Sequence, residues 1–194
     1  FTVRDILDKG YRASALRYLL ISVHYRKQLT FNWDVLAQAE AALMRLGDFL
    51  ARVAAVAGAG DAQAGIATRV DAARVAFRAM IASDLNVPGA LGAVFDLVRD
   101  MNAAMDQQTV RAADAAVIHG AFEEFDRVLG VMALRRAEDA APPIPQSELD
   151  ALIAARRDAR HARDFARADA IRVGLEARGV VLEDHATGTR WKRK

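Results

Sequence analysis

Apolar residues recur every three or four positions along most of the chain, with polar residues between them. This spacing places the apolar side chains on one face of a helix. Four such amphipathic segments can bury their apolar faces only by packing against one another, so we predict a mainly α fold built as an antiparallel helical bundle. The four segments cover residues 35–53, 66–81, 91–105 and 110–129.

Local signals indicate where several helices begin. Thr2 and Asp5 have the spacing of a capping box, in which each side chain accepts a hydrogen bond from the other's backbone N–H. Asn32 and Asn86 each precede an amphipathic segment, in the position where a side-chain oxygen caps the first turn. The sequence Gly58–Asp61 separates the first two segments of the bundle.

The pattern changes after the last bundle helix. Residues 141–145 contain three of the four prolines, which favours an extended, stiff linker that acts as a hinge. Two further helices are predicted beyond it, the second capped by Asp164 with Phe165 facing inward, followed by a β-hairpin around 185–188. We divide the chain into a short helical segment at 1–30, the bundle at 31–136, the linker at 137–146 and a small α+β tail at 147–194.

Composition limits the possible functions. The 194 residues are 53% hydrophobic, enough for one core and a small satellite. Cysteine is absent, which excludes disulfides, thiolate zinc sites and a cysteine nucleophile. No uncharged apolar run reaches the roughly 18 residues of a membrane span, and no secretory signal opens the chain, so we expect a cytoplasmic location. Because the first residue is a bulky Phe1 rather than methionine, we also expect the chain to begin inside a longer protein.

Charge is unevenly distributed. The net charge is +2, yet residues 142–194 hold eleven Lys and Arg against eight Asp and Glu, and the remainder holds sixteen against seventeen. Residues 190–194 place four cations around Trp191. This asymmetry favours an anionic partner for the tail, although a solvated terminus explains the charge alone about equally well.

The order of residues in the tail is specific. It reads A-R-H-A-R-D-F-A-R-A-D-A-I-R over 159–172, G-V-V-L-E-D over 179–184 and G-T-R-W over 188–191. These blocks resemble the carboxyl-terminal end of bacterial cysteinyl-tRNA synthetases. Residues 1–26 resemble the segment after that family's K-M-S-K-S loop, and 77–88 resemble a block of its helical DALR domain, so the resemblance covers nearly the whole chain.

The sequence also departs from this family. Ser14, Ser83, Val87 and the pair at 185–186 replace its usual residues, which indicates a divergent member. The H-I-G-H and K-M-S-K-S signatures for ATP are absent, as are the cysteines that hold the family's zinc. The resemblance therefore implies the tRNA-binding part of a cysteine–tRNA ligase, inactive alone, whose missing catalytic domain would use ATP, Mg²⁺ and zinc. Its partners would be tRNA(Cys) and that catalytic domain, with neither DNA nor a membrane.

The resemblance assigns anticodon recognition to six positions of the tail. Unpaired bases offer their edges to Asp and Arg and their faces to aromatic rings. Phe165 and Trp191 could instead be core residues, and the charged residues could form a solvated face. His24, Tyr25 and Arg26 are expected to brace the catalytic lobe rather than touch tRNA. The six positions are Arg160, Phe165, Asp169, Asp184, Arg190 and Trp191, and the expected phosphate contacts are Lys192, Arg193 and Lys194.

Three other functions compete with this one. A free-standing tRNA-binding module acting in trans is the first, and a continuous reading frame upstream with H-I-G-H would exclude it. A related ligase that joins cysteine to a sugar–inositol amine is the second, but it needs no anticodon-binding tail. A purely structural helical protein is the third, and the ordered pattern over 160–191 argues against it.

Overall fold

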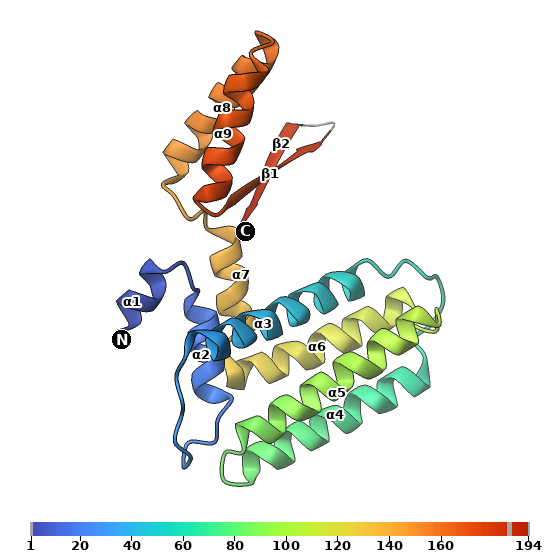
Figure 1. Ribbon diagram of the computed structural model, residues 1–194. Helices are drawn as coiled ribbons and strands as arrows, with labels where there is room; N and C mark the ends of the chain where they lie inside the picture. The colour runs from blue at the N-terminus through green and yellow to red at the C-terminus, as the bar shows by residue number, and fades with distance from the viewer. Residues whose placement is uncertain (1, 186–187, 194) are drawn as a thin grey trace. The chain divides into compact units, whose positions relative to one another are not determined.

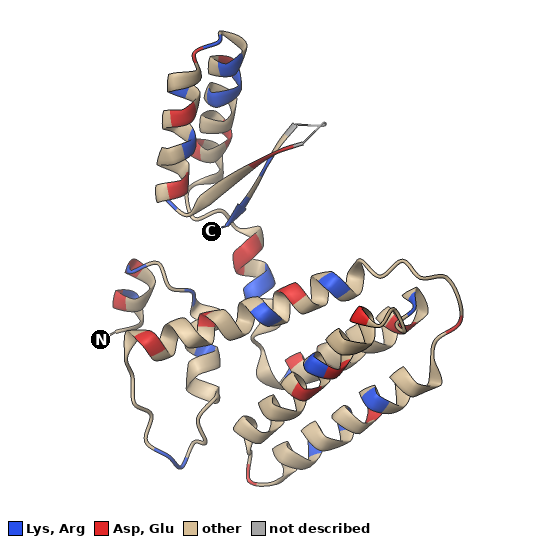
Figure 2. Cartoon of the chain, turned by 45° about the vertical axis from the view of Figure 1, so that its right-hand side comes forward, with Lys and Arg blue, Asp and Glu red and all other residues tan. Residues whose placement is uncertain are grey.

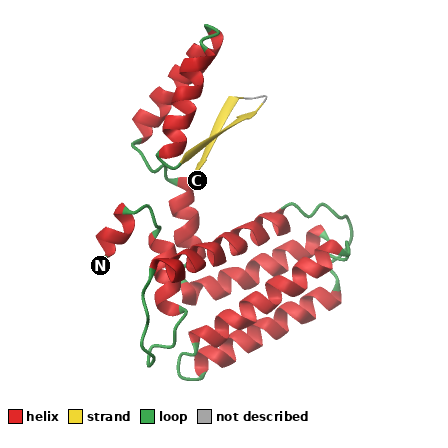
Figure 3. Cartoon of the chain, in the orientation of Figure 1, coloured by secondary structure: helices red, strands yellow, loops and turns green. Residues whose placement is uncertain are grey.

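The computed structural model describes residues 2–185 and 188–193 and confirms the predicted fold class, a helical chain with one two-stranded ribbon (Figures 1 and 3). The chain forms two compact units that divide between Arg135 and Arg136. The elements are α1 (Val3–Asp8), α2 (Ala13–Ile21), α3 (Trp33–Ala54), α4 (Ala64–Ala82), α5 (Val87–Asp106), α6 (Ala112–Leu129), α7 (Met132–Ala140), α8 (Gln146–His161), α9 (Phe165–Ala177), β1 (Val180–His185) and β2 (Gly188–Arg193).

The first unit is a bundle in which α3, α4, α5 and α6 pack side by side along their apolar stripes (Figure 1). Phenylalanines from three of these helices meet in its centre. The ring of Phe122 lies 5.1 Å from that of Phe49 and 5.6 Å from that of Phe125, which in turn lies 4.7 Å from Phe77. Burying one such side chain contributes about 1.5–3 kcal/mol, so this aromatic centre is a main source of the bundle's stability.

The capping signals read from the sequence are confirmed. The N–H of Asp5 donates to Oγ1 of Thr2 at 3.2 Å, and the N–H of Thr2 donates to Oδ2 of Asp5 at 2.7 Å. Asn32 accepts from the backbone of residue 35 at 2.8 Å, and Asn86 accepts from that of residue 89 at 3.0 Å. Each bond satisfies an N–H that the helix itself leaves unpaired, which fixes where the helix starts.

The sequence pattern did not predict α7 as a helix separate from the bundle. The chain turns at Gly130, whose φ of +63° is left-handed, and α7 then begins at Met132. The carboxylate of Asp126 accepts three backbone hydrogen bonds, from residues 131–133, at 2.7–2.8 Å. This buried cap starts a new helix, and α7 continues through Ala140, so the first residues of the predicted linker are helical.

The second unit contains α8, α9 and the ribbon, and it has its own small core. The antiparallel strands pair Leu182 with Trp191 and Asp184 with Thr189, as the hairpin signal predicted, while residues 186–187 of its turn lie outside the described residues. The core is completed by Ile144, which is only 9% exposed. This residue of the predicted linker therefore belongs to the tail core. The buried members are Ile144, Leu149, Leu175 and Val180.

In the part of the chain that the structure describes, no helix combines the length and the apolar character needed to cross a bilayer.

Candidate functional site

The helix α8 carries two arginines on the same stripe as its core residues. Leu149, Ile153, Arg156 and Arg160 follow one another at intervals of three or four, so the apolar face that packs on the tail core ends in two guanidinium groups. On β1, Asp184 lies two residues beyond the core position 182, on the same side of the strand. The helical spacing of α8 and the alternation of sides along β1 therefore bring two arginines and a carboxylate together at the edge of the apolar core.

The carboxylate of Asp184 accepts four hydrogen bonds from the protein. Arg156 donates through Nη1 to Oδ1 and through Nη2 to Oδ2, both at 2.9 Å. Arg160 donates through Nη1 to Oδ2 at 2.5 Å, and the Thr189 hydroxyl donates to Oδ1 at 2.8 Å. A carboxylate offers about four acceptor positions, so those of Asp184 are all used.

These contacts also set the ionisation of the group. The hydrogen bond from Arg156, followed by those from Thr189 and Arg160, holds the pKa of Asp184 well below its ordinary value, while burial acts in the opposite direction. The hydrogen bond to Asp184 raises the pKa of Arg156, and the negative charge of Asp169 adds to this effect. Asp169 itself, 64% exposed, accepts from Nε of Arg172 at 3.0 Å. Arg156 thus lies within the fields of two acids, Asp184, which it binds directly, and Asp169.

Phe165 stands at the start of α9 and is 66% exposed, so the prediction that it faces inward is wrong. The inward positions of α9 are Ala168 and Leu175, which are buried. The tail core ends at the Leu182–Trp191 pair, and the next position on that face of the ribbon is the charged Asp184, so among the described residues the tail core does not extend to Phe165. An exposed phenylalanine is available for contact with another molecule.

The ribbon has two different faces, because residues paired across it point to the same side and the sides alternate along each strand. Trp191 is half-buried and packs on the tail core, as the core interpretation proposed. Arg190, opposite Glu183, lies on the other face together with Lys192. The six predicted positions are therefore not one cluster. Asp184 and Trp191 lie on the ribbon face toward the helices, where Arg160 of α8 binds Asp184, and Arg190 lies on the opposite face.

The expected phosphate contacts also differ from one another. Lys192 is 60% exposed and pairs with Glu183. Arg193 is half-buried, and its Nη1 donates to the carbonyl of Glu138 at 3.2 Å, which ties the end of β2 to α7. Lys194 lies outside the described residues.

Three residues of the tail belong in this description but were missed from the sequence. An arginine within a helix ordinarily indicates a solvated face, but Arg156 lies on the apolar stripe of α8, and that position is a signal of its burial. Arg163 and Arg167 flank Phe165, are exposed, and make no ion pair within residues 2–185 and 188–193. Figure 2 shows Lys and Arg recurring along α8 and α9 as far as the turn that joins them.

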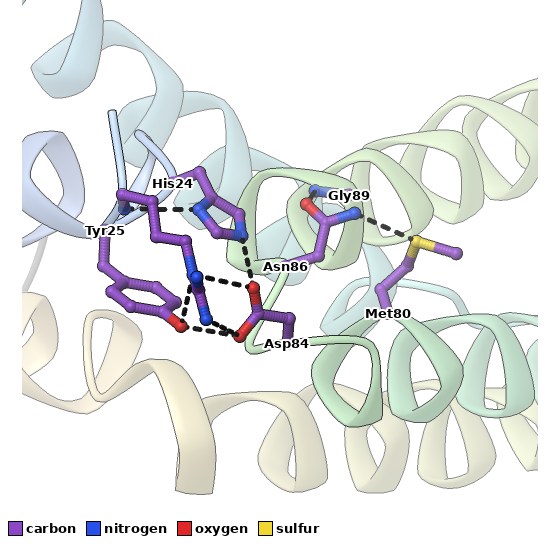
Figure 4. Close-up of polar contacts among 7 residues, drawn as sticks. His24, Tyr25, Met80, Asp84, Asn86 and Gly89 are labelled. Atoms are coloured by element: carbon purple, nitrogen blue, oxygen red, sulfur yellow. Dashed lines mark hydrogen bonds and ion pairs between the residues drawn. The ribbon is translucent and has the colours of Figure 1, made fainter. Parts of the chain in front are cut away.

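A second polar cluster lies in the bundle unit, where the predicted brace His24–Arg26 meets the α4–α5 turn (Figure 4). The Tyr25 hydroxyl donates to Oδ1 of Asp84 at 2.6 Å, and the Nε of Arg26 lies 3.0 Å from Oδ2. Asp84 and Leu85 both have left-handed backbone, with φ of 53° and 51°, a conformation that costs energy for such residues. The cluster thus holds a strained turn in place, which is a structural role within the bundle.

Comparisons with known proteins agree with the resemblance. Residues 76–134 match the DALR domain, and residues 145–191 match the cysteinyl-tRNA ligase anticodon binding domain. A cysteine–tRNA ligase of Solibacter usitatus is 41% identical over 194 residues, with all of this chain and 41% of the relative aligned.

Two further relatives extend the comparison. A cysteine–tRNA ligase of Geobacter sulfurreducens is 39% identical over 211 residues, and one of Koribacter versatilis is 36% identical over 219 residues. Both alignments include the whole of this chain and 43% or 44% of the relative, so the chain spans about two fifths of the length of these proteins. The chain belongs to the cysteinyl-tRNA ligase family and carries that family's DALR domain and anticodon-binding domain.

Proposed function

We propose that the chain is the tRNA-binding part of a cysteine–tRNA ligase and that its tail recognises the anticodon of tRNA(Cys). The observation that carries this proposal is the surface at the α8–α9 turn, within the region that matches the anticodon-binding domain. There the exposed Phe165 lies two positions in sequence from each of two exposed arginines, 163 and 167, which have no acidic partner among the described residues. Aromatic faces beside cations are the combination that binds unpaired bases and their phosphates.

The contacts suggest a different role for each residue. Phe165 would stack on a base, and the accessible carboxylate of Asp169 would accept hydrogen bonds from a base edge. Arg160 is half-exposed and would donate to a base or a phosphate. Asp184 would reach a base only by giving up one of its present donors. On the outer face of the ribbon, Arg190 and Lys192 would contact phosphates, and so would Lys194 beyond them.

We extend the proposal to the whole protein, which would attach cysteine to tRNA(Cys) in protein biosynthesis in the cytoplasm. ATP, Mg²⁺ and zinc would belong to its catalytic domain. The residues of this chain do not fit the zinc: the sequence has no cysteine, and the described residues bring together no group of three potential metal ligands. The whole of this chain aligns with part of longer cysteine–tRNA ligases, which favours this proposal over a free-standing module acting in trans.

The test is direct binding of the chain to a tRNA(Cys) transcript and to the same transcript with a substituted anticodon. We expect preference for the first, and we expect Asp169→Ala to cost about 1–3 kcal/mol of binding and to reduce the preference. Asp150→Ala is the matched control, because it removes an exposed acid near the start of α8, away from the α8–α9 turn. Equal affinity of the chain for both transcripts would contradict the proposal.

A further inference from the structure

The two arginines that bind Asp184 differ in burial and geometry. The side chain of Arg156 is 10% exposed and makes two parallel hydrogen bonds, one to each carboxylate oxygen. Arg160 is 50% exposed and makes a single bond to Oδ2. Removing the carboxylate from Arg156 would leave a buried cation without compensation, whereas the guanidinium of Arg160 can return to water. The Arg160–Asp184 bond is therefore the one that opens at lower cost.

We propose that Arg156 is a positioning residue for anticodon recognition, which keeps Asp184 in place while the Arg160–Asp184 bond opens and is replaced by bonds to an unpaired base. This inference rests on the function proposed above. Opening that bond frees an acceptor site on Oδ2 of Asp184 and donors on Arg160, next to each other. A carboxylate acceptor beside a guanidinium donor matches the Watson–Crick edge of an unpaired base, on which donors and acceptors are neighbours.

This proposal explains why Asp184 accepts more hydrogen bonds than are needed to hold the ribbon against the helices. Core packing of Leu182 and Trp191 already holds the ribbon against the helices. With Arg156 fixed, the loss of the Arg160 bond does not release the carboxylate, because three of its four hydrogen bonds remain. The base then exchanges one hydrogen bond for another, and little reorganisation of the ribbon is needed.

The first test is Arg156→Lys, with Arg157→Lys as the matched control. A lysine keeps the charge but cannot make two parallel bonds, so Asp184 should lose its orientation. We expect the ratio of affinities for tRNA(Cys) and an anticodon-substituted transcript to fall by about tenfold. The control should leave the ratio unchanged, because Arg157 is 66% exposed and pairs with Asp158 on its own helix. A ratio that stays intact in Arg156→Lys would overturn the inference.

Nuclear magnetic resonance of the arginine guanidinium groups provides a second test that needs no variant. In the free chain, the two Nη groups of Arg156 should rotate slowly, since each donates a hydrogen bond to Asp184. Adding tRNA(Cys) should shift the signals of Arg160 and leave those of Arg156. Equal shifts of both, or free rotation of Arg156 without RNA, would overturn the inference. Equal affinity of the unaltered chain for both transcripts would instead overturn the proposed function.

Discussion

Replacing Asp184 with asparagine removes the charge that compensates Arg156 and leaves the shape nearly unchanged. Breaking a fully buried pair by removing one partner costs about 3–5 kcal/mol, and an exposed pair contributes about 0–1 kcal/mol. Arg156 is 10% exposed and Asp184 is 43% exposed, so the pair lies between these limits. We expect Asp184→Asn to lower the free energy of unfolding of the tail by about 2 kcal/mol.

Thermal unfolding followed by tryptophan fluorescence can measure this loss. The chain has two tryptophans, so a Trp33→Phe background leaves Trp191 as the reporter of the tail. For a unit of this size, 2 kcal/mol corresponds to a fall in Tm of about 10 °C. Asp158→Asn is the control, because that exposed acid pairs with an exposed arginine on its own helix. A shift of less than about 2 °C in Asp184→Asn would refute the reasoning that Arg156 depends on this carboxylate.

Three further outcomes are expected. Because the folded-state pKa of Asp184 is lowered, its stabilisation is present above the unfolded pKa and is lost as the pH falls below about 4; acid titration of Trp191 fluorescence should show this loss, and Asp184→Asn should flatten it. Phe165→Ala should change the Tm little yet weaken binding of tRNA(Cys) by about 1–3 kcal/mol, measured by calorimetry; an unaltered affinity would exclude stacking. Lys192→Ala should weaken all tRNAs alike and lower the salt slope of binding by roughly one phosphate contact, whereas an unchanged slope would mean that its pairing with Glu183 is its only role.

The residues whose roles can be predicted correctly from the sequence are those whose contacts lie a few positions away in the chain. Asn32 and Asn86 cap helices through bonds to residues three positions away, so a short pattern was sufficient. Phe165 fits the helical period of α9 but is exposed, because the core beneath it ends sooner than the helix does. Arg156 depends on a carboxylate 28 residues away on a strand, and only the folded register brings the two together.

The same limit applies to α7. Its start is fixed by Asp126, a residue of the preceding helix whose carboxylate turns back onto backbone N–H groups five to seven residues later. A sequence pattern of alternating apolar residues carries no sign of such a cap. It also gave no sign that Ile144, between prolines, would be a core residue.

The burial of Ile144 has a consequence for anyone who wishes to excise the tail and study it in isolation. The family match begins at residue 145, and the helix α8 begins at Gln146, so either boundary would discard a side chain that closes the small core. It would also discard Pro143, which lies close to the backbone of Gly179. A fragment of about fifty residues buries little apolar surface, so the loss of one core side chain lowers its stability substantially. An excised tail that starts at residue 141 should fold cooperatively, and one that starts at residue 146 should melt earlier and less sharply.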